Sequence, residues 1–117
     1  MKFQGMTGNF AEANAEALAV AVFKGEKASS DVLKSLDKLT GGLIASVMKA
    51  EEFKGDAGQI ALLRFVSNGN VRASRLLLVG VGDSDKYKGS SVAAASGAAT
   101  RFLRSRNVKN FAFLPRF

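Results

Sequence analysis

One stretch near the start of the chain restricts the possible folds more than any other. Residues 16–23 read Glu-Ala-Leu-Ala-Val-Ala-Val-Phe, so that Leu18, Val20 and Val22 alternate with alanines. A strand with this pattern has two apolar faces, which is typical of a central strand covered by helices on both sides. The sequence therefore predicts an α/β fold in which helices flank a sheet.

A helical region follows this strand and is interrupted by two glycines. Ser29 or Ser30 can cap its start, and apolar residues then recur at helical spacing over residues 32–47. The pair Gly41-Gly42 breaks the pattern, and two glycines inside a helix cost about 2 kcal/mol relative to alanine. We therefore expect two helices, or one sharply kinked helix, covering the same face of the sheet.

A longer helix is expected near the end of the chain. Ser90 or Ser91 can cap its start, it should run to about Arg106, and Asn107 can terminate it. Its first half, residues 92–99, is alanine, serine and glycine after a single valine. Because small side chains let a helix approach a sheet, we expect this helix to pack closely on the strands.

Four further strands are expected, at Lys2–Gly5, Ile60–Val66, Arg75–Val81 and Phe111–Leu114. The second and third are predicted to form a hairpin through the turn at residues 67–70. Arg75–Val81 is the most apolar strand and is expected at the sheet centre. The final strand–helix–strand unit implies a parallel crossover. The prediction is a mixed β-sheet flanked by helices.

Composition fits a single domain over residues 1–117 and excludes several kinds of site. With 47% hydrophobic and 23% charged residues, the chain should be globular. It has no cysteine, which excludes disulfides and thiolate chemistry, and no histidine, the commonest general base and transition-metal ligand. No apolar run approaches the roughly 20 residues that span a bilayer, and no secretory signal is present. We expect a cytoplasmic protein without a membrane partner.

The loop after the most apolar strand, Gly80-Val81-Gly82-Asp83-Ser84, is a candidate anion site because backbone amides in such a loop can cradle a phosphate. It lacks the third glycine of a dinucleotide fingerprint, so a tight structural turn is the competing interpretation. Asp56, Asp83 and Asp85 are the plausible oxygen ligands in loops. Lysines stand where a calcium loop would need further acceptors, so solvated turn residues are expected.

The net charge of +7 favours an anionic partner, although many soluble domains are basic without one. Arg101, Arg104, Arg106 and Lys109 form the densest basic cluster. It can be a solvated face or a patch that contacts phosphates. We expect Phe102, which lies within the cluster, to belong to the core. Any DNA binding through this cluster should be weak and independent of sequence.

Four segments together resemble one known family. They are the strand at Leu18–Phe23, the helix and glycine break at Leu36–Ile44, Phe53-Lys54-Gly55 with Gly58, and Arg75-Leu76-Leu77-Leu78-Val79-Gly80-Val81-Gly82. Their order and spacing are similar to those of the amino-terminal domain of leucyl aminopeptidases, also called cytosol aminopeptidases, peptidase family M17. The resemblance covers most of the chain and implies a macrodomain-like α/β fold.

The resemblance also implies what the chain lacks. In that family two divalent metal ions, zinc or manganese, act in a later carboxy-terminal domain that releases N-terminal amino acids from peptides. No catalytic, cofactor-binding or metal-binding residue is therefore expected here. The family's domain continues beyond the last strand, so we expect a fragment truncated at its C-terminal end. Its expected partners are its own catalytic domain and the sister subunits of a homo-oligomer.

Two functions stay open at this point. The first is a non-catalytic accessory domain that helps to package the parent enzyme and limits access to its active site. The second is a stand-alone module for an anionic ligand, either nucleic acid or an ADP-ribose-like molecule, since macrodomains bind ADP-ribose with loops like Gly80–Ser84. In either case, uncovered apolar surface after Pro115 should favour self-association, through a sheet edge among other routes.

Overall fold

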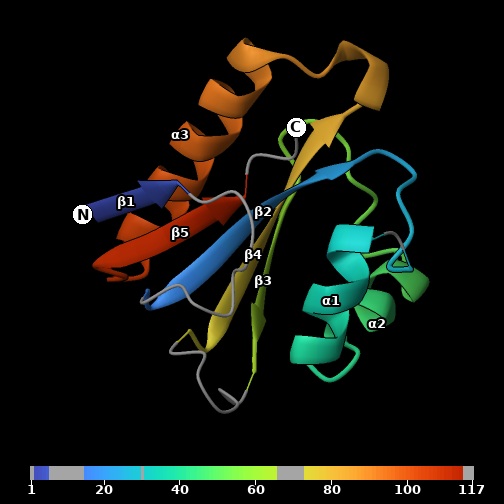
Figure 1. Cartoon of the computed structure of the whole chain (residues 1–117), viewed down its shortest axis with the longest axis horizontal. Coiled ribbons are helices and arrows are strands. Elements are labelled where there is room, and N and C mark those ends of the chain that lie inside the picture. The colour runs from blue at the N-terminus through green and yellow to red at the C-terminus, as the bar shows by residue number, and fades with distance from the viewer. Residues whose placement is uncertain (1, 6–14, 30, 66–72, 115–117) are drawn as a thin grey trace.

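The computed structural model describes residues 2–5, 15–29, 31–65 and 73–114 (Figure 1). A 3₁₀ turn at Ser84–Lys86 precedes the last helix. The strands and helices are, in chain order, β1 (Lys2–Gly5), β2 (Ala17–Phe23), α1 (Asp31–Leu39), α2 (Leu43–Lys49), β3 (Ile60–Arg64), β4 (Arg75–Gly82), α3 (Gly89–Ser105) and β5 (Asn110–Leu114).

The strands form one mixed sheet in the order β1-β5-β2-β4-β3. Neighbouring strands are parallel except for the antiparallel pair of β3 and β4. The expected mixed sheet is confirmed. The strand expected at Phe111–Leu114 corresponds to β5, which lies inside the sheet between β1 and β2. The turn expected at residues 67–70 lies outside the described residues.

The prediction that Arg75–Val81 lies at the sheet centre was wrong by one strand position. β2 occupies the centre, and β4 lies between it and the edge strand β3. Every residue from Ala17 to Val22 is fully buried. The alternation of alanine with larger residues lets β2 pack on both faces without crowding, which a central strand requires.

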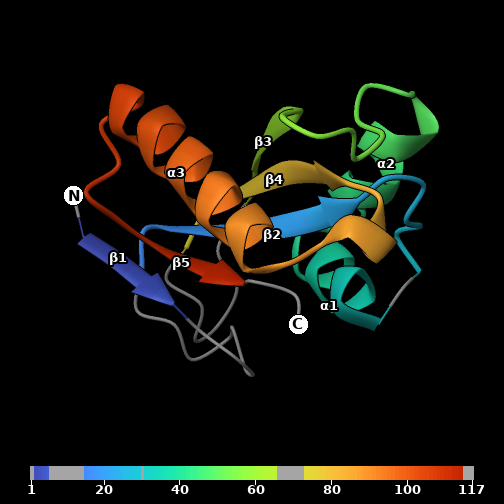
Figure 2. The ribbon, with the colours of Figure 1, turned by 90° about the horizontal axis from the view of Figure 1, so that it is seen from above.

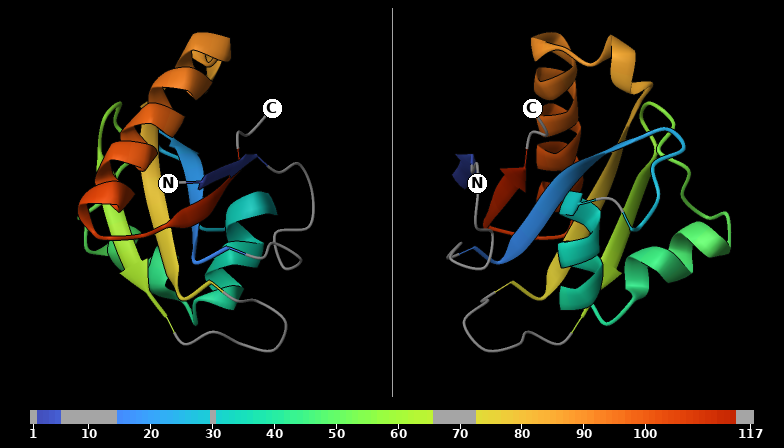
Figure 3. Two further views of the ribbon diagram at one scale, coloured as in Figure 1. Left: turned by 90° about the vertical axis from the view of Figure 1, so that its left-hand side faces the viewer. Right: turned by 45° about the vertical axis from the view of Figure 1, so that its right-hand side comes forward.

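Helices cover the two faces of the sheet separately (Figures 2 and 3). On one face, Leu33 and Leu36 of α1 and Ile44 of α2 share a buried cluster with Leu18 and Leu76 of the strands. On the other face the helix that packs on the strands is α3. Its buried residues Ala95, Ala99 and Leu103 contact a cluster that contains Leu77, Val79, Phe111 and Phe113. The prediction that both pieces of the broken helix cover one face is confirmed.

Gly41 and Gly42 separate α1 from α2 as predicted, with two helices rather than one kinked helix. Both have positive φ, 71° and 89°, which glycine adopts without steric cost. Their amides donate to the carbonyls of Lys38 and Asp37, a pattern that closes a helix end. The Asp37 carboxylate then accepts a hydrogen bond from the Ala45 amide at 3.0 Å, so the end of α1 caps the start of α2.

α3 begins earlier than predicted. Lys88, not Ser90 or Ser91, is the N-cap residue, and the Ser91 hydroxyl accepts a hydrogen bond from the Lys88 amide at 3.2 Å. Ser91 thus has the position of the reciprocal residue in a capping box, three residues inside the helix. The predicted end is confirmed: Asn107 has φ 61°, and the Asn107 and Val108 amides bond back to Arg104 and Leu103.

The strand bounds differ from the expected ones by one or two residues. β3 ends at Arg64, although the Phe65 amide still donates to Ser74 at 2.9 Å. β4 extends through Gly82, and β5 begins at Asn110. Within the described part of the chain, no helix combines the length and the apolar character that crossing a membrane would need.

Candidate functional site

The carboxyl end of β4 meets the loop before β3 in a tight junction. The Gly80 amide donates to the carbonyl of Gln59 at 2.7 Å, and the Gly82 amide donates to that of Gly55 at 3.0 Å. The Gly58 amide donates in turn to the carbonyl of Gly80 at 3.0 Å. The amides of Gly80 and Gly82, which the phosphate-cradle hypothesis needs, are therefore already bonded within the fold.

Glycine is required at this junction by close approach of two backbones. A Cβ atom at Gly80 would collide with the carbonyl oxygen of Asp56. A Cβ atom at Gly55 would collide with the carbonyl of Phe23, and Gly55 also has φ 87°. The side-chain oxygen Oε1 of Gln59 holds the same loop in place, because it accepts hydrogen bonds from the backbone amides of Lys54 and Gly55 at 2.8 and 3.1 Å. The geometry favours the structural interpretation of the glycines over an anion site.

The loop carboxylates do not gather. Asp56, Asp83 and Asp85 are all exposed, and Asp83 lies 3.8 Å from the ammonium group of Lys86. Among the described residues, no three carboxylate, histidine or cysteine side chains lie close enough together to hold a metal ion. The carboxylates that the structure describes therefore assemble no metal centre.

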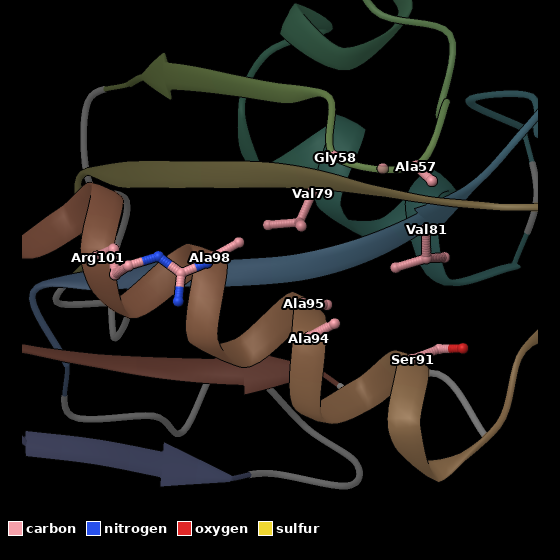
Figure 4. A pocket seen from close by; sticks show the side chains of 10 residues that line it. Ala57, Gly58, Val79, Val81, Ser91, Ala94, Ala95, Ala98 and Arg101 are labelled. Atoms are coloured by element: carbon pink, nitrogen blue, oxygen red, sulfur yellow. The ribbon is translucent and has the colours of Figure 1, made fainter.

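A hollow of about 350 Å³ lies between α3 and the end of β4 (Figure 4). The first half of α3 lines one wall with small side chains, and Val79, Gly80 and Val81 line the other. Arg101 lies at one end and Ser91 toward the other. The lining is mostly apolar and contains no pair of groups for acid–base catalysis. Sequence reasoning missed this hollow because it interpreted the small residues of α3 as a close-packing face.

The four residues of the predicted basic cluster line three hollows of the structure. All four side chains are exposed. Arg101 lines the hollow beside α3. Arg104 and Lys109 line a shared depression at the end of the helix, whereas Arg106 lines a different one with Arg75 and Glu16. The structure thus brings Arg104 and Lys109 together at the end of α3, and Arg101 lies three residues before Arg104 on the same helix.

Phe102 belongs to the same helix, α3. It is half-buried, with the Arg106 guanidinium 5.0 Å from the centre of its ring, and it packs at the margin of the buried cluster under α3. A guanidinium over a ring is a favourable cation–π contact. The expectation that Phe102 belongs to the core is confirmed in part, because its side chain is partly buried against that cluster.

Two further arginines, missed by the sequence reasoning, face each other on the hairpin. Arg64 of β3 is the register partner of Arg75 in β4. Like charges directly opposite on neighbouring strands destabilise the pair. The sequence contained the signal, because a hairpin with strands at Ile60–Val66 and Arg75–Val81 brings these ends together.

Comparison with known proteins agrees with this fold. The sequence profile described as "Cytosol aminopeptidase family, N-terminal domain" matches residues 19–116. A probable cytosol aminopeptidase of Alkaliphilus metalliredigens is 27% identical over 115 residues, which cover 98% of this chain and 23% of that protein. One from Paraburkholderia xenovorans is 31% identical over 110 residues, 94% of this chain and 21% of that protein. The chain therefore spans about a fifth of the length of these relatives.

Two solved structures have the same fold. A mutant of tomato leucine aminopeptidase superposes on the whole of this chain with a TM-score of 0.76 and 24% identity, over 23% of its own length. The macrodomain of Mycobacterium tuberculosis DarG superposes on 95% of this chain with a TM-score of 0.66 and 13% identity, over 74% of its length. The macrodomain-like α/β architecture expected from the sequence is confirmed.

Proposed function

Since the chain belongs to the N-terminal domain family of the cytosol aminopeptidases, we propose that it is the non-catalytic accessory domain of a larger cytoplasmic aminopeptidase. The match over residues 19–116 carries this proposal. The parent enzyme would release N-terminal amino acids from peptides with two divalent metal ions, zinc or manganese, held outside this chain. A pair of such ions polarises the carbonyl group and activates water.

The composition of the chain supports a role without chemistry of its own. It has no histidine or cysteine, and the described carboxylates stand apart. Its core is a packed sheet, and the amides of Gly80 and Gly82 are bonded to the carbonyls of Gln59 and Gly55. A rigid domain of this kind is suited to contacts between subunits and to limiting which peptides reach a catalytic centre.

The test compares the longer protein with a form that lacks residues 1–117. Removal should change the number of subunits in the oligomer, as measured by sedimentation equilibrium. It should also raise the rate of hydrolysis of long peptides relative to that of a chromogenic leucine substrate. The isolated chain, with manganese or zinc added, should not hydrolyse that substrate. An unchanged number of subunits together with an unchanged preference for peptide length would refute the accessory role.

A second function, weak binding of DNA, is favoured by the exposure of all four residues of the basic cluster. The phosphate backbone binds such side chains without reading sequence. The junction at Gly80 and Gly82 gives no support to an ADP-ribose-like ligand, because its amides are bonded internally. Nucleic acid is therefore the better of the two anionic ligands considered.

A further inference from the structure

β3 is an edge strand whose outer side has no neighbour in the described part of the chain. It pairs with β4 on one side and ends the sheet order on the other. It is five residues long, Ile60–Arg64, and lies at the margin of the sheet in Figure 1. An exposed edge of this kind presents unpaired N–H and C=O groups to another strand.

The register identifies which backbone groups point outward. Gln59 and Phe65 both bond to the β4 side, through Gly80 and Ser74 respectively. In an antiparallel pair, hydrogen-bonded positions alternate along the strand. Ala61 and Leu63 therefore also bond toward β4. The N–H and C=O groups of the intervening residues, Ile60, Leu62 and Arg64, point to the open side.

β3 has few of the usual protections of an edge. It contains no proline or glycine, and its register with β4 runs without a bulge. Its single charge, Arg64, lies at the end of the strand, and the four residues before it are partly exposed and apolar. Natural edges are commonly blocked by short length, bulges, proline or a charge within the strand. β3 therefore remains able to pair with another strand.

We infer that β3 pairs with β3 of a second copy of this chain, in antiparallel orientation across a two-fold axis at Leu62. This register aligns all three outward residues. Leu62 faces its own equivalent, and Ile60 faces Arg64 of the second copy, so each outward residue donates one hydrogen bond and accepts one. The two Arg64 residues then stand four residues apart, about 13 Å at 3.3 Å per residue, and avoid direct repulsion.

An antiparallel pair is the arrangement that closes with two copies. Across a two-fold axis each copy uses the same edge, so no unpaired β3 edge is left for a third copy. A head-to-tail contact that does not close would instead continue into a filament. The pair would join two sheets into one continuous sheet. This inference goes beyond the proposed function, because it depends on the edge alone and not on a parent peptidase.

The sequence offers a clean cross-linking test, because the full chain has no cysteine. In the L62C variant the two thiols would lie across the axis, with Cα atoms about 5.5 Å apart, within reach of a disulfide. The matched R64C variant places its thiols about 13 Å apart, too far for a disulfide. Mild oxidation should therefore give dimers with L62C and monomers with R64C. A mixture of I60C and R64C should give mixed dimers that neither variant forms alone.

A variant without added thiols tests the same contact. Leu62→Lys places two ammonium groups opposite each other at the axis and should raise the dimer dissociation constant by about tenfold in sedimentation. Arg64→Lys, which keeps the charge, should leave it unchanged, and circular dichroism of each variant verifies folding. A wild-type chain that stays monomeric at high concentration overturns the inference. Equal cross-linking of L62C and R64C also overturns it.

Discussion

β2 contributes to both faces of the sheet, and the two faces it contacts are packed differently. Toward α1 and α2 it presents Leu18, Val20 and Val22, which are buried among leucine and isoleucine side chains. Toward α3 it presents alanines, which meet Ala95 and Ala99 of the helix. One face is filled by large side chains from two short helices. On the other face one long helix approaches β2 closely through its alanines, and large side chains of β4 and β5 fill the rest.

The difference shows where this fold tolerates change. A face packed with large side chains loses contact area when one is shortened. A contact made by small side chains, such as that between β2 and α3, has little area to lose, but it has no room for a larger side chain at its contact line. The hollow beside α3 has the same cause. Ala94 and Ala98 line it, and their side chains are too small to fill the space between the helix and β4.

The largest expected effect is on the face covered by α1 and α2. Leu36→Ala removes a fully buried side chain from that cluster and should lower the free energy of unfolding by about 3 kcal/mol. Urea titration followed by circular dichroism measures the loss. A loss below about 1 kcal/mol would mean that this face collapses around the gap, and the contrast with the α3 face would fail.

The opposite change tests the α3 face. Ala99→Leu adds bulk to a fully buried contact with the sheet and should cost about 2 kcal/mol. Ala98→Leu is the matched control, because Ala98 lines the hollow and is half-exposed. It should be neutral or slightly stabilising in the same titration. Equal costs at the two positions would show that the helix does not pack by close approach.

A smaller effect on stability is expected at the residues that follow α2 and α3, one on each face of the sheet. Glu51 after α2 has φ 60° and Asn107 after α3 has φ 61°, a conformation that glycine adopts freely and other residues at a cost. Glu51→Gly should stabilise the chain by about 1 kcal/mol. Asn107→Gly should gain less, because asparagine tolerates this conformation better. Thermal unfolding measures both, and an equal or reversed order would contradict this account.

Much of the fold could be predicted because single residues decide it locally. The alternation around Val20 identified a strand with two apolar faces, and Gly41 and Gly42 identified the helix break. The order of strands could not be read in the same way. β2 and β4 are both apolar, and which of them is central depends on pairing between distant segments that no local pattern contains.

The site was less predictable than the fold. A glycine at position 80 fits a phosphate loop and a close backbone contact equally well, and the atoms that distinguish them belong to Gly55 and Asp56, 24 or more residues earlier. The start of α3 was misplaced for a related reason, since a serine can serve as the cap or, like Ser91, as its reciprocal partner. In both cases residue type was informative and tertiary contact decided the outcome.

The smallest expected effect on stability concerns charge on the α3 side. Arg101→Ala with Arg104→Ala changes exposed residues and should alter the free energy of unfolding by no more than about 0.5 kcal/mol. If the basic cluster binds DNA with about four phosphate contacts, the logarithm of affinity should fall with the logarithm of salt concentration with a slope near −3 to −4. The double substitution should flatten that slope by about two.

The matched control removes the same charge from the opposite face. Lys34 and Lys38 are exposed on α1, so Lys34→Ala with Lys38→Ala lowers the net charge equally and leaves the α3 side intact. If the contact surface is the α3 side, this control keeps a slope near the wild-type value, because counterions are released where phosphates are neutralised. Equal flattening by both double variants would mean that net charge, and not the cluster, attracts DNA. An affinity that does not change with salt concentration would exclude contact with the DNA phosphates. Fluorescence anisotropy with a labelled duplex over a range of salt concentrations distinguishes these outcomes.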